Sequence, residues 1–307
     1  MTPDGPVPWR VACWRRKFCA TRWDRDGRVM DHRIRVLSVL ALASAVAVSA
    51  AVATPVTPHR LRAASGRTQA TVAYYAWPSD FGRPLPKIEI RRRGRMQLIE
   101  RVPPALSERK PYRAIPFALG SSPLRIVDLD GDGEPEVLLS LYWAGTRCCM
   151  WTRIYRFDRL RGRYVASVAF WGNFQDFFRL RDLDRDGRPE LVARDGRIES
   201  ISSTYDYFSP VRIFSYRDGR LVDVTRRYRQ AVERDARWLH GRGRWTRELL
   251  SAWVADEYLL GRRALARREV QRALRRGELA VPRYWHAPSP EAYVHQLYRF
   301  LRNAGYE

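Results

Sequence analysis

Two short acidic segments carry the residues best suited to chemistry in this chain. In residues 128–136, carboxylates stand at positions one, three, five and nine and a glycine at position six, and residues 182–190 repeat this spacing. Calcium takes six to eight oxygen ligands at about 2.3–2.6 Å, and the glycine lets the chain fold back so that these oxygens converge. We therefore predict two Ca²⁺ sites in which position seven contributes its carbonyl oxygen. The ligands would come from Asp128, Asp130, Asp132, Glu134, Glu136, Asp182, Asp184, Asp186, Arg188 and Glu190.

An acidic turn without a metal is the alternative for each loop. Four carboxylates within a few ångströms repel one another by several kcal/mol in sum at an effective dielectric of about 20, which favours the calcium site. A helix-loop-helix calcium hand is excluded because it takes a bidentate glutamate at position twelve, where this chain has Leu139 and Ala193. Pro135 and Pro189 inside the loops also point to a different module.

The loops lie within a β-rich region. From residue 71 to residue 225, short alternating runs are bounded by Gly, Pro, Asp and Asn, a pattern typical of strands. A hairpin with a glycine-arginine turn recurs three times, at Gly94, Gly162 and Gly219. The acidic loops precede the second and third hairpins, so each of these units has four strands, as a propeller blade does. The strands expected to flank the loops are residues 124–127, 137–143, 177–180 and 191–193.

The acidic loops and their flanking strands resemble the FG-GAP or VCBS-type repeats, found in the integrin α-chain propeller, whose calcium loops read D-x-D-x-D-G-x-x-D. The resemblance covers residues 120–225 and, less closely, residues 71–119, where the first unit has no acidic loop. It implies that the named residues bind calcium in a mainly structural role. Here the ninth position is glutamate, no FG-GAP signature precedes the loops, and three units cannot close a propeller of the usual seven blades.

Helical periodicity begins after residue 225. Four segments have apolar residues at helical spacing: residues 226–240, 246–260, 264–276 and 291–304. Ser289 and Pro290 are suited to begin the last helix and Gly305 to end it. We predict a mainly β protein with α, in which a partial β-propeller-like array of about three four-stranded units precedes a C-terminal helical bundle. The expected parts are residues 1–53 (N-terminal extension and signal peptide), 54–70 (linker), 71–225 (β-repeat domain) and 226–307 (α-helical domain).

An apolar, alanine-rich run in residues 36–53 follows a basic flank and ends in Ala-Val-Ala. This is the pattern of a secretory signal peptide, and a start at Met30 would give it ordinary length. The run is also near the shortest length that spans a bilayer, so an uncleaved anchor is the alternative. Cleavage would leave only Cys148 and Cys149, as a strained vicinal disulfide or two buried thiols. We expect a secreted or cell-surface protein, with membrane contact only if the leader stays.

No nucleophile elbow, His-Glu-x-x-His, phosphate loop or dinucleotide-binding turn occurs in the sequence, so we expect no enzyme. The formal net charge of +23 comes almost wholly from arginines spread along the chain, and we expect no nucleic-acid partner. Aromatic clusters either bind sugars or a protein or pack between the blades. They are Tyr74, Tyr75 and Trp77; Tyr142 and Trp143; Phe170, Trp171 and Phe174; and Tyr205, Tyr207 and Phe208.

These observations predict a secreted, non-catalytic calcium-binding repeat protein that serves as a binding, adhesion or interaction module. Its partner would be an extracellular protein or glycan, and self-association would complete the β-array. The alternative function is a calcium-dependent hydrolase or lyase acting on extracellular polysaccharide. A loop that supplies a full set of oxygens leaves its ion little room for substrate, which favours the non-catalytic role.

Overall fold

A computed structural model describes residues 57–75, 85–103, 114–118, 120–143, 148–173, 177–201, 208–281 and 288–307. The chain divides into two compact units, Met1–Thr54 and Pro55–Glu307, and all described residues belong to the second. The predicted signal peptide and its alternative as an anchor therefore lie outside the described residues. Within those residues, no helix has the length and apolar character needed to cross a membrane.

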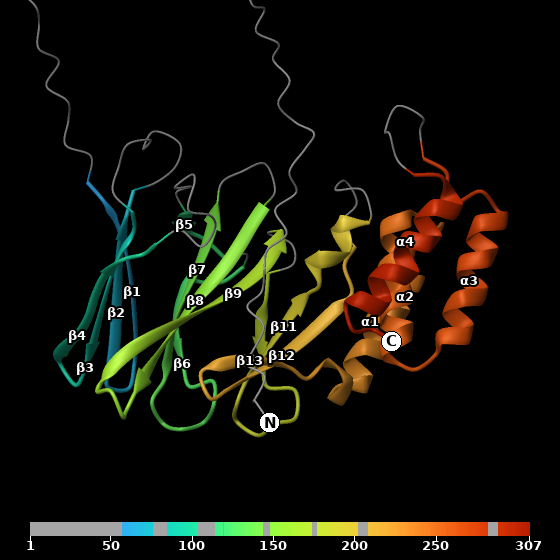
Figure 1. The fold of residues 1–307 in the computed structure, drawn as a ribbon. Coiled ribbons are helices and arrows are strands. Elements are labelled where there is room, and N and C mark those ends of the chain that lie inside the picture. Colours follow the sequence, from blue (N-terminus) through green and yellow to red (C-terminus); the bar gives the residue numbers. More distant parts are fainter. Residues whose placement is uncertain are drawn as a thin grey trace, which may run out of the picture. The chain divides into compact units, whose positions relative to one another are not determined.

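The β-rich part of the second unit consists of three antiparallel sheets (Figure 1). The first contains β1 (His59–Ser65), β2 (Thr68–Tyr74), β3 (Lys87–Arg92) and β4 (Arg95–Arg101) in that order. In the second, β5 (Ala114–Pro116) and β6 (Leu124–Val127) both pair with β7 (Glu136–Trp143), which is followed by β8 (Cys148–Asp158) and β9 (Arg163–Asn173). The third contains β10 (Arg179–Arg181), β11 (Glu190–Arg194), β12 (Val211–Arg217) and β13 (Arg220–Asp223). The prediction of a mainly β protein with several short antiparallel units is confirmed.

The predicted glycine-arginine hairpin turns are present in all three sheets. In the β3–β4 turn, Arg93 and Gly94 have φ angles of 52° and 76°, and in the β12–β13 turn Asp218 and Gly219 have φ angles of 51° and 79°. Positive φ at both central residues is the requirement of a two-residue type I′ turn, whose twist matches that of the flanking strands. The glycine, which is the second residue of each pair, adopts this conformation without steric cost.

The prediction of a linker over residues 54–70 was wrong. β1 lies within this range and pairs with β2 along its whole length, from His59 opposite Tyr74 to Ser65 opposite Thr68. Its composition resembles a linker because an edge strand buries only one face and needs few apolar residues. Here that face is supplied by Leu61 and Ala63, which pack against the core between the first and second sheets.

Strand β7, in the second sheet, is buried on both faces. Successive residues of a strand point to opposite faces, so Val137 and Leu139 of β7 face the first sheet whereas Leu138 faces the third. The core shared with the first sheet also contains Val72, Ile88, Ile90, Trp151 and Tyr155. The core shared with the third sheet also contains Ile154, Trp171, Phe178, Leu191 and Tyr216. The sheets are therefore held together face to face by apolar side chains.

The four predicted helices are confirmed as α1 (Arg229–His240), α2 (Arg247–Leu259), α3 (Arg263–Arg275) and α4 (Pro290–Asn303). α1 begins later than expected because Thr225–Arg227 form a 3₁₀ turn. The side chain of Thr246 accepts a hydrogen bond from the N–H of Leu249, and Ser289 caps α4 in the same way. Such caps satisfy N–H groups that lack a partner inside the helix. The helices share one core with Val211 and Ile213 of β12, so they pack on the third sheet.

A buried carboxyl at this helix–sheet contact predicts a pH dependence of stability. Asp256 of α2 is fully buried near Asp235 of α1, which pairs with Arg194 of β11. Burial, followed by the negative charge of Asp235, raises the pKa of Asp256 well above its ordinary value of 3.8. The folded protein thus keeps a proton that the unfolded chain releases, so stability falls as pH rises from that ordinary value towards the folded one.

We expect Asp256→Asn to remove this dependence, because an amide does not titrate. As pH rises between the two pKa values, the free energy of unfolding of the wild type should fall by about 1.4 kcal/mol per pH unit more than that of the variant. Denaturant unfolding at several pH values between the two pKa values measures the slope. Equal slopes in the two proteins would show that Asp256 binds no extra proton in the folded state.

Candidate metal centre

The first acidic loop connects β6 to β7 and is shaped by its own carboxylates. Asp128 accepts hydrogen bonds from the N–H groups of Gly131 (2.8 Å) and Gly133 (2.9 Å), one on each oxygen. Asp132 Oδ1 accepts the N–H of Glu134 at 2.7 Å. Gly131 and Gly133 have φ angles of 75° and 80°, so the loop turns back at two left-handed residues.

Glu136, the first residue of β7, lies buried beneath this loop with an exposed fraction of 0%. Its Oε2 accepts the N–H of Leu129 at 2.9 Å, whereas its Oε1 is buried without a hydrogen-bond partner among the described residues. Burial raises the pKa of Glu136 to about 8, and the nearby carboxylates Asp130, Asp132 and Asp128 act in the same direction. Because buried polar atoms are nearly always paired, the orphaned oxygen fits a cation ligand.

The structure brings together three of the predicted side-chain ligands of this loop. Carboxylate oxygens of Asp128, Asp130 and Glu136 all lie within 4.8 Å of one another. Burial and the charges of Asp132 and Asp128 raise the pKa of Asp130. A divalent cation among these oxygens would offset their mutual repulsion, so the residues fit the predicted calcium ion.

The second loop, between β10 and β11, has the same geometry. Asp182 Oδ2 accepts the N–H of Gly187 at 3.0 Å, as position one bonds to position six in the first loop. Glu190 Oε2 accepts the N–H of Leu183 at 2.9 Å, as position nine bonds to position two. Oxygens of Asp182, Asp184 and Glu190 again lie within 4.8 Å of one another, and Glu190 is only 4% exposed. Two different sequences therefore fold into one ligand arrangement.

Two features of the loops were not predicted. Position four also has a positive φ, at Gly131 in the first loop and at Arg185 (φ 63°) in the second. A glycine indicates such a conformation in the sequence, whereas an arginine does not. In the second loop, the hydroxyl of Tyr228 donates to Asp184 Oδ2 at 3.0 Å. Burial and the hydrogen bonds to Glu190 and Asp184 raise the pKa of Tyr228. Tyr228 lies far along the chain from the loop, so no local spacing could reveal it.

The fifth-position carboxylates lie outside both clusters. Asp132 Oδ2 is 3.6 Å from a guanidinium nitrogen of Arg159, and Asp186 Oδ2 accepts the Nε–H of Arg188 at 2.9 Å. Asp132 and Asp186 thus remain predicted ligands. To bind the ion, each would have to give up its contact with an arginine. Each of these pairs is at least partly exposed, so the exchange would cost little.

At position seven, the side chains are used for contacts other than the clusters. Glu134 pairs through both carboxylate oxygens with Arg92 of β3, with Nε 2.7 Å from Oε2. This contact fastens the first loop to the first sheet. The side chain of Glu134 pairs with Arg92, and that of Arg188 pairs with Asp186. At position seven the backbone carbonyl oxygen therefore remains as the predicted ligand.

The two loops contact each other. A Cβ added at Gly131 would lie 2.9 Å from Cδ of Arg188, so the arginine stem packs directly on the first loop. Residues of both loops line a cavity of about 490 Å³. Its charged lining comprises Asp130, Asp132, Asp184, Asp186 and Glu190 together with Arg156, Arg188, Arg217, Asp218 and Arg227.

The described members of the aromatic clusters are mostly packed inside. Trp171 is buried and its indole N–H donates to Thr152 Oγ1 at 3.0 Å. Tyr74 and Tyr142 pack against the inter-sheet cores, whereas Phe170 of β9 is 53% exposed. Trp77, Phe174, Tyr205 and Tyr207 lie outside the described residues, as do the side chains of Trp143, Cys148 and Cys149.

Part of the chain is similar to a curated protein. No protein-family model matches the chain, and no solved structure matches it. Among curated proteins, "Uncharacterized protein y4bJ" of Sinorhizobium fredii (strain NBRC 101917 / NGR234) is 28% identical over 148 residues, which is 45% of this chain. The matched region is 23% of that protein, so the chain spans less than a quarter of its relative's length.

Proposed function

We propose that this protein is an exported, non-catalytic calcium-binding protein in which two ions stiffen its second and third sheets. The observation that supports the proposal most is the repeated cluster: Asp128, Asp130 and Glu136 in one loop, and their counterparts in the other. In both loops the N–H of position two donates to the glutamate at position nine, and the N–H of position six donates to the aspartate at position one.

Calcium suits these loops better than other common cations. The side-chain ligands are all carboxylates, which are hard oxygen donors that favour calcium, magnesium or manganese over zinc or copper. Magnesium demands near-ideal octahedral geometry and keeps several waters, whereas calcium accepts the irregular, oxygen-rich set that a flexible loop offers. In each loop an ion would join the turn to the first residue of the following strand through Glu136 or Glu190.

We further propose that the sheets are blade-like units akin to FG-GAP or VCBS-type repeats. The strand order supports this likeness. Strands β6 to β9 and strands β10 to β13 each form a series of four, and in each series the acidic loop connects the first two strands. The helices pack on the outer side of the third sheet, which would end the array there. Completion of the array by self-association would then involve the first sheet.

The proposed partner is an extracellular protein or glycan, and the proposed location is secreted or at the cell surface. The leader-like run in residues 36–53 supports export. A second function, a calcium-dependent hydrolase or lyase acting on polysaccharide, is favoured by the cavity between the loops, since carboxylates and arginines face it together. Release of new sugar ends from acidic polysaccharide, dependent on calcium and on Arg156, would support the enzyme instead.

Thermal unfolding with and without calcium tests the proposed function. Each occupied site stabilises the folded state by about 2.7 kcal/mol at 100 times its dissociation constant, and each kcal/mol raises the unfolding temperature by about 2–4 °C in a domain of this size. We therefore expect excess calcium to raise the unfolding temperature by roughly 10–20 °C over the chelator-treated protein, and magnesium to raise it less. An unchanged unfolding temperature in calcium would contradict the proposal.

A further inference from the structure

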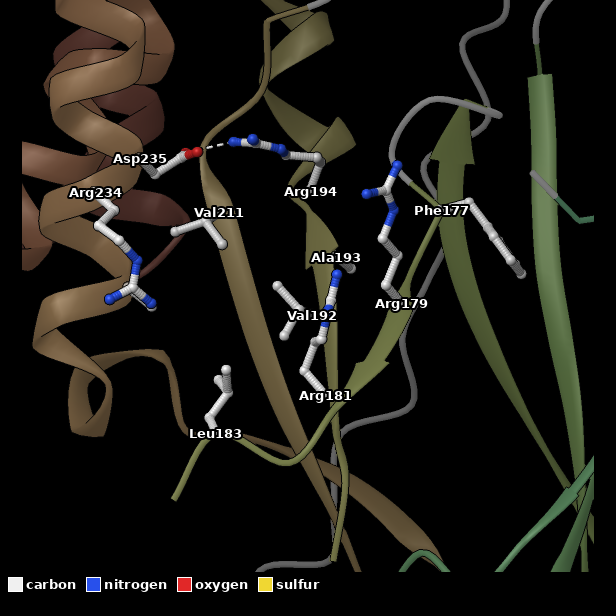
Figure 2. Close-up of a pocket in the computed structure, with 11 residues that line it drawn as sticks. Phe177, Arg179, Arg181, Leu183, Val192, Ala193, Arg194, Val211, Arg234 and Asp235 are labelled. Atoms are coloured by element: carbon white, nitrogen blue, oxygen red, sulfur yellow. Dashed lines mark hydrogen bonds and ion pairs between the residues drawn. The ribbon is translucent and has the colours of Figure 1, made fainter. Parts of the chain in front are cut away.

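We propose that a cleft between the third sheet and α1 binds a small ligand that carries two or more negative charges on oxygen atoms. The cleft has a volume of about 620 Å³, within the usual range for small-molecule sites. Its charged lining consists of Arg179, Arg181, Arg194, Arg234 and Asp235 (Figure 2). The cleft shares Leu183 with the second acidic loop, but no carboxylate of either cluster lines it, and the proposal does not depend on calcium being the ligand of those clusters.

Three of the four arginines have no ion-pair partner in the part of the chain that the structure describes. Arg194 pairs with Asp235 and also donates to the carbonyl oxygen of Ser209 at 3.0 Å. Within the described ranges, no ion pair engages Arg179, Arg181 or Arg234. The cleft therefore holds an excess of about three positive charges, which a ligand with one negative charge would leave largely unbalanced.

The three unpaired arginines face one space from two sides. Arg179 and Arg181 are two residues apart on β10, so they lie on the same face of the strand with Cα atoms about 7 Å apart. Leu180 between them points the other way, into the core shared with the second sheet. Figure 2 shows Arg194 on the neighbouring β11 and Arg234 on the facing α1. A ligand between the strand and the helix would meet guanidinium groups from both.

The walls between the arginines are apolar. Leu183, Val192 and Val211 line the cleft between β10, β12 and α1. These side chains give a ligand an apolar surface to pack against between the guanidinium groups. The planar guanidinium group matches phosphate and carboxylate oxygens in a two-point contact. The ligand chemistry is therefore an oxyanion, supplied either by a phosphate ester or by the carboxylates of an acidic sugar.

Isothermal titration with two charged probes and their uncharged counterparts tests this site. Glucose 6-phosphate represents the phosphate ester and digalacturonate the acidic sugar, with glucose and galactobiose as controls. We expect one equivalent of at least one charged probe to bind saturably and neither control to bind. The probe that binds identifies the source of the oxyanion.

Single variants locate the binding. Arg181→Gln and Arg234→Gln should each weaken binding at least tenfold, because each removes a hydrogen bond to a charged group, and both residues are exposed, so the variants should fold. Arg268→Gln is the matched control, since it removes one charge from the exposed face of α3, away from the cleft.

Failure of both charged probes to bind would overturn the proposal. So would equal weakening by all three variants, which would mean that the net charge of +23 attracts anions without a site.

Discussion

Replacement of Glu136 by glutamine should lower stability in calcium but not in a chelator. Glu136 is fully buried, and among the described residues one of its oxygens has no hydrogen-bond partner. Without calcium its raised pKa of about 8 keeps it mostly protonated at neutral pH, so glutamine replaces a neutral group and its carbonyl oxygen still accepts the N–H of Leu129. Without calcium the variant should therefore be as stable as the wild type or more stable. With calcium at roughly 10–100 times the dissociation constant, loss of the site should cost about 1.5–2.7 kcal/mol.

Denaturant unfolding in excess calcium and in chelator measures both values. Glu134→Gln is the matched control, because Glu134 belongs to the same loop but its side chain pairs with Arg92 outside the cluster. Its effect should be the same with and without calcium. If Glu136→Gln were equally destabilised in both conditions, Glu136 would serve only to hold the loop by a hydrogen bond.

Asp195→Ala should destabilise the protein by about 2–3 kcal/mol, since it leaves the buried hydroxyl of Tyr306 without its acceptor and the partly exposed Arg197 and Arg212 without their counter-charge. Asp195 follows β11 and is only 2% exposed. Its Oδ1 accepts the Nε–H of Arg197 at 2.8 Å, and its Oδ2 accepts the hydroxyl of Tyr306 at 2.7 Å, with Arg212 at 3.9 Å. One carboxylate thus ties the third sheet to the C-terminal residues.

The pKa of Asp195 shows which effect dominates there. Burial alone would raise it, but the hydrogen bond from Arg197 and the charge of Arg212 outweigh burial and lower the pKa below its ordinary value. The stability that Asp195 contributes is therefore present above its ordinary pKa and is lost as pH falls through the lowered one.

Denaturant unfolding of Asp195→Ala and Tyr306→Phe separates the two contacts. Tyr306→Phe removes one hydroxyl and should cost about 1 kcal/mol; a similar small cost for Asp195→Ala would refute the central role of the carboxylate.

The elements that the sequence predicts well are those specified by local chemistry. The helices follow from apolar spacing and from the caps Thr246 and Ser289, and the hairpins follow from glycines that adopt positive φ. The turns of the acidic loops are equally local, because their backbone N–H groups donate to carboxylates at most seven positions away. Strand β1 was missed because its polar residues lie on an exposed face and only Leu61 and Ala63 reach the core.

The parts of the site that were missed depend on contacts between distant segments. Tyr228 donates to Asp184, and Arg92 pairs with Glu134, across a sheet-to-helix contact and a sheet-to-sheet contact. The cluster around Asp195 depends likewise on Tyr306 at the other end of the helical region. Such contacts leave no periodic pattern in one sequence, because only the packing of the sheets brings them together.

The number of calcium ions bound per chain tests the proposed function most directly. Equilibrium dialysis or isothermal titration should give two ions for the wild type, one for Glu136→Gln, one for Glu190→Gln and none for the double variant. These values follow from one buried ninth-position glutamate in each of two clusters. A wild type that binds no calcium, or a double variant that still binds two ions, would contradict the assignment of these loops as calcium sites.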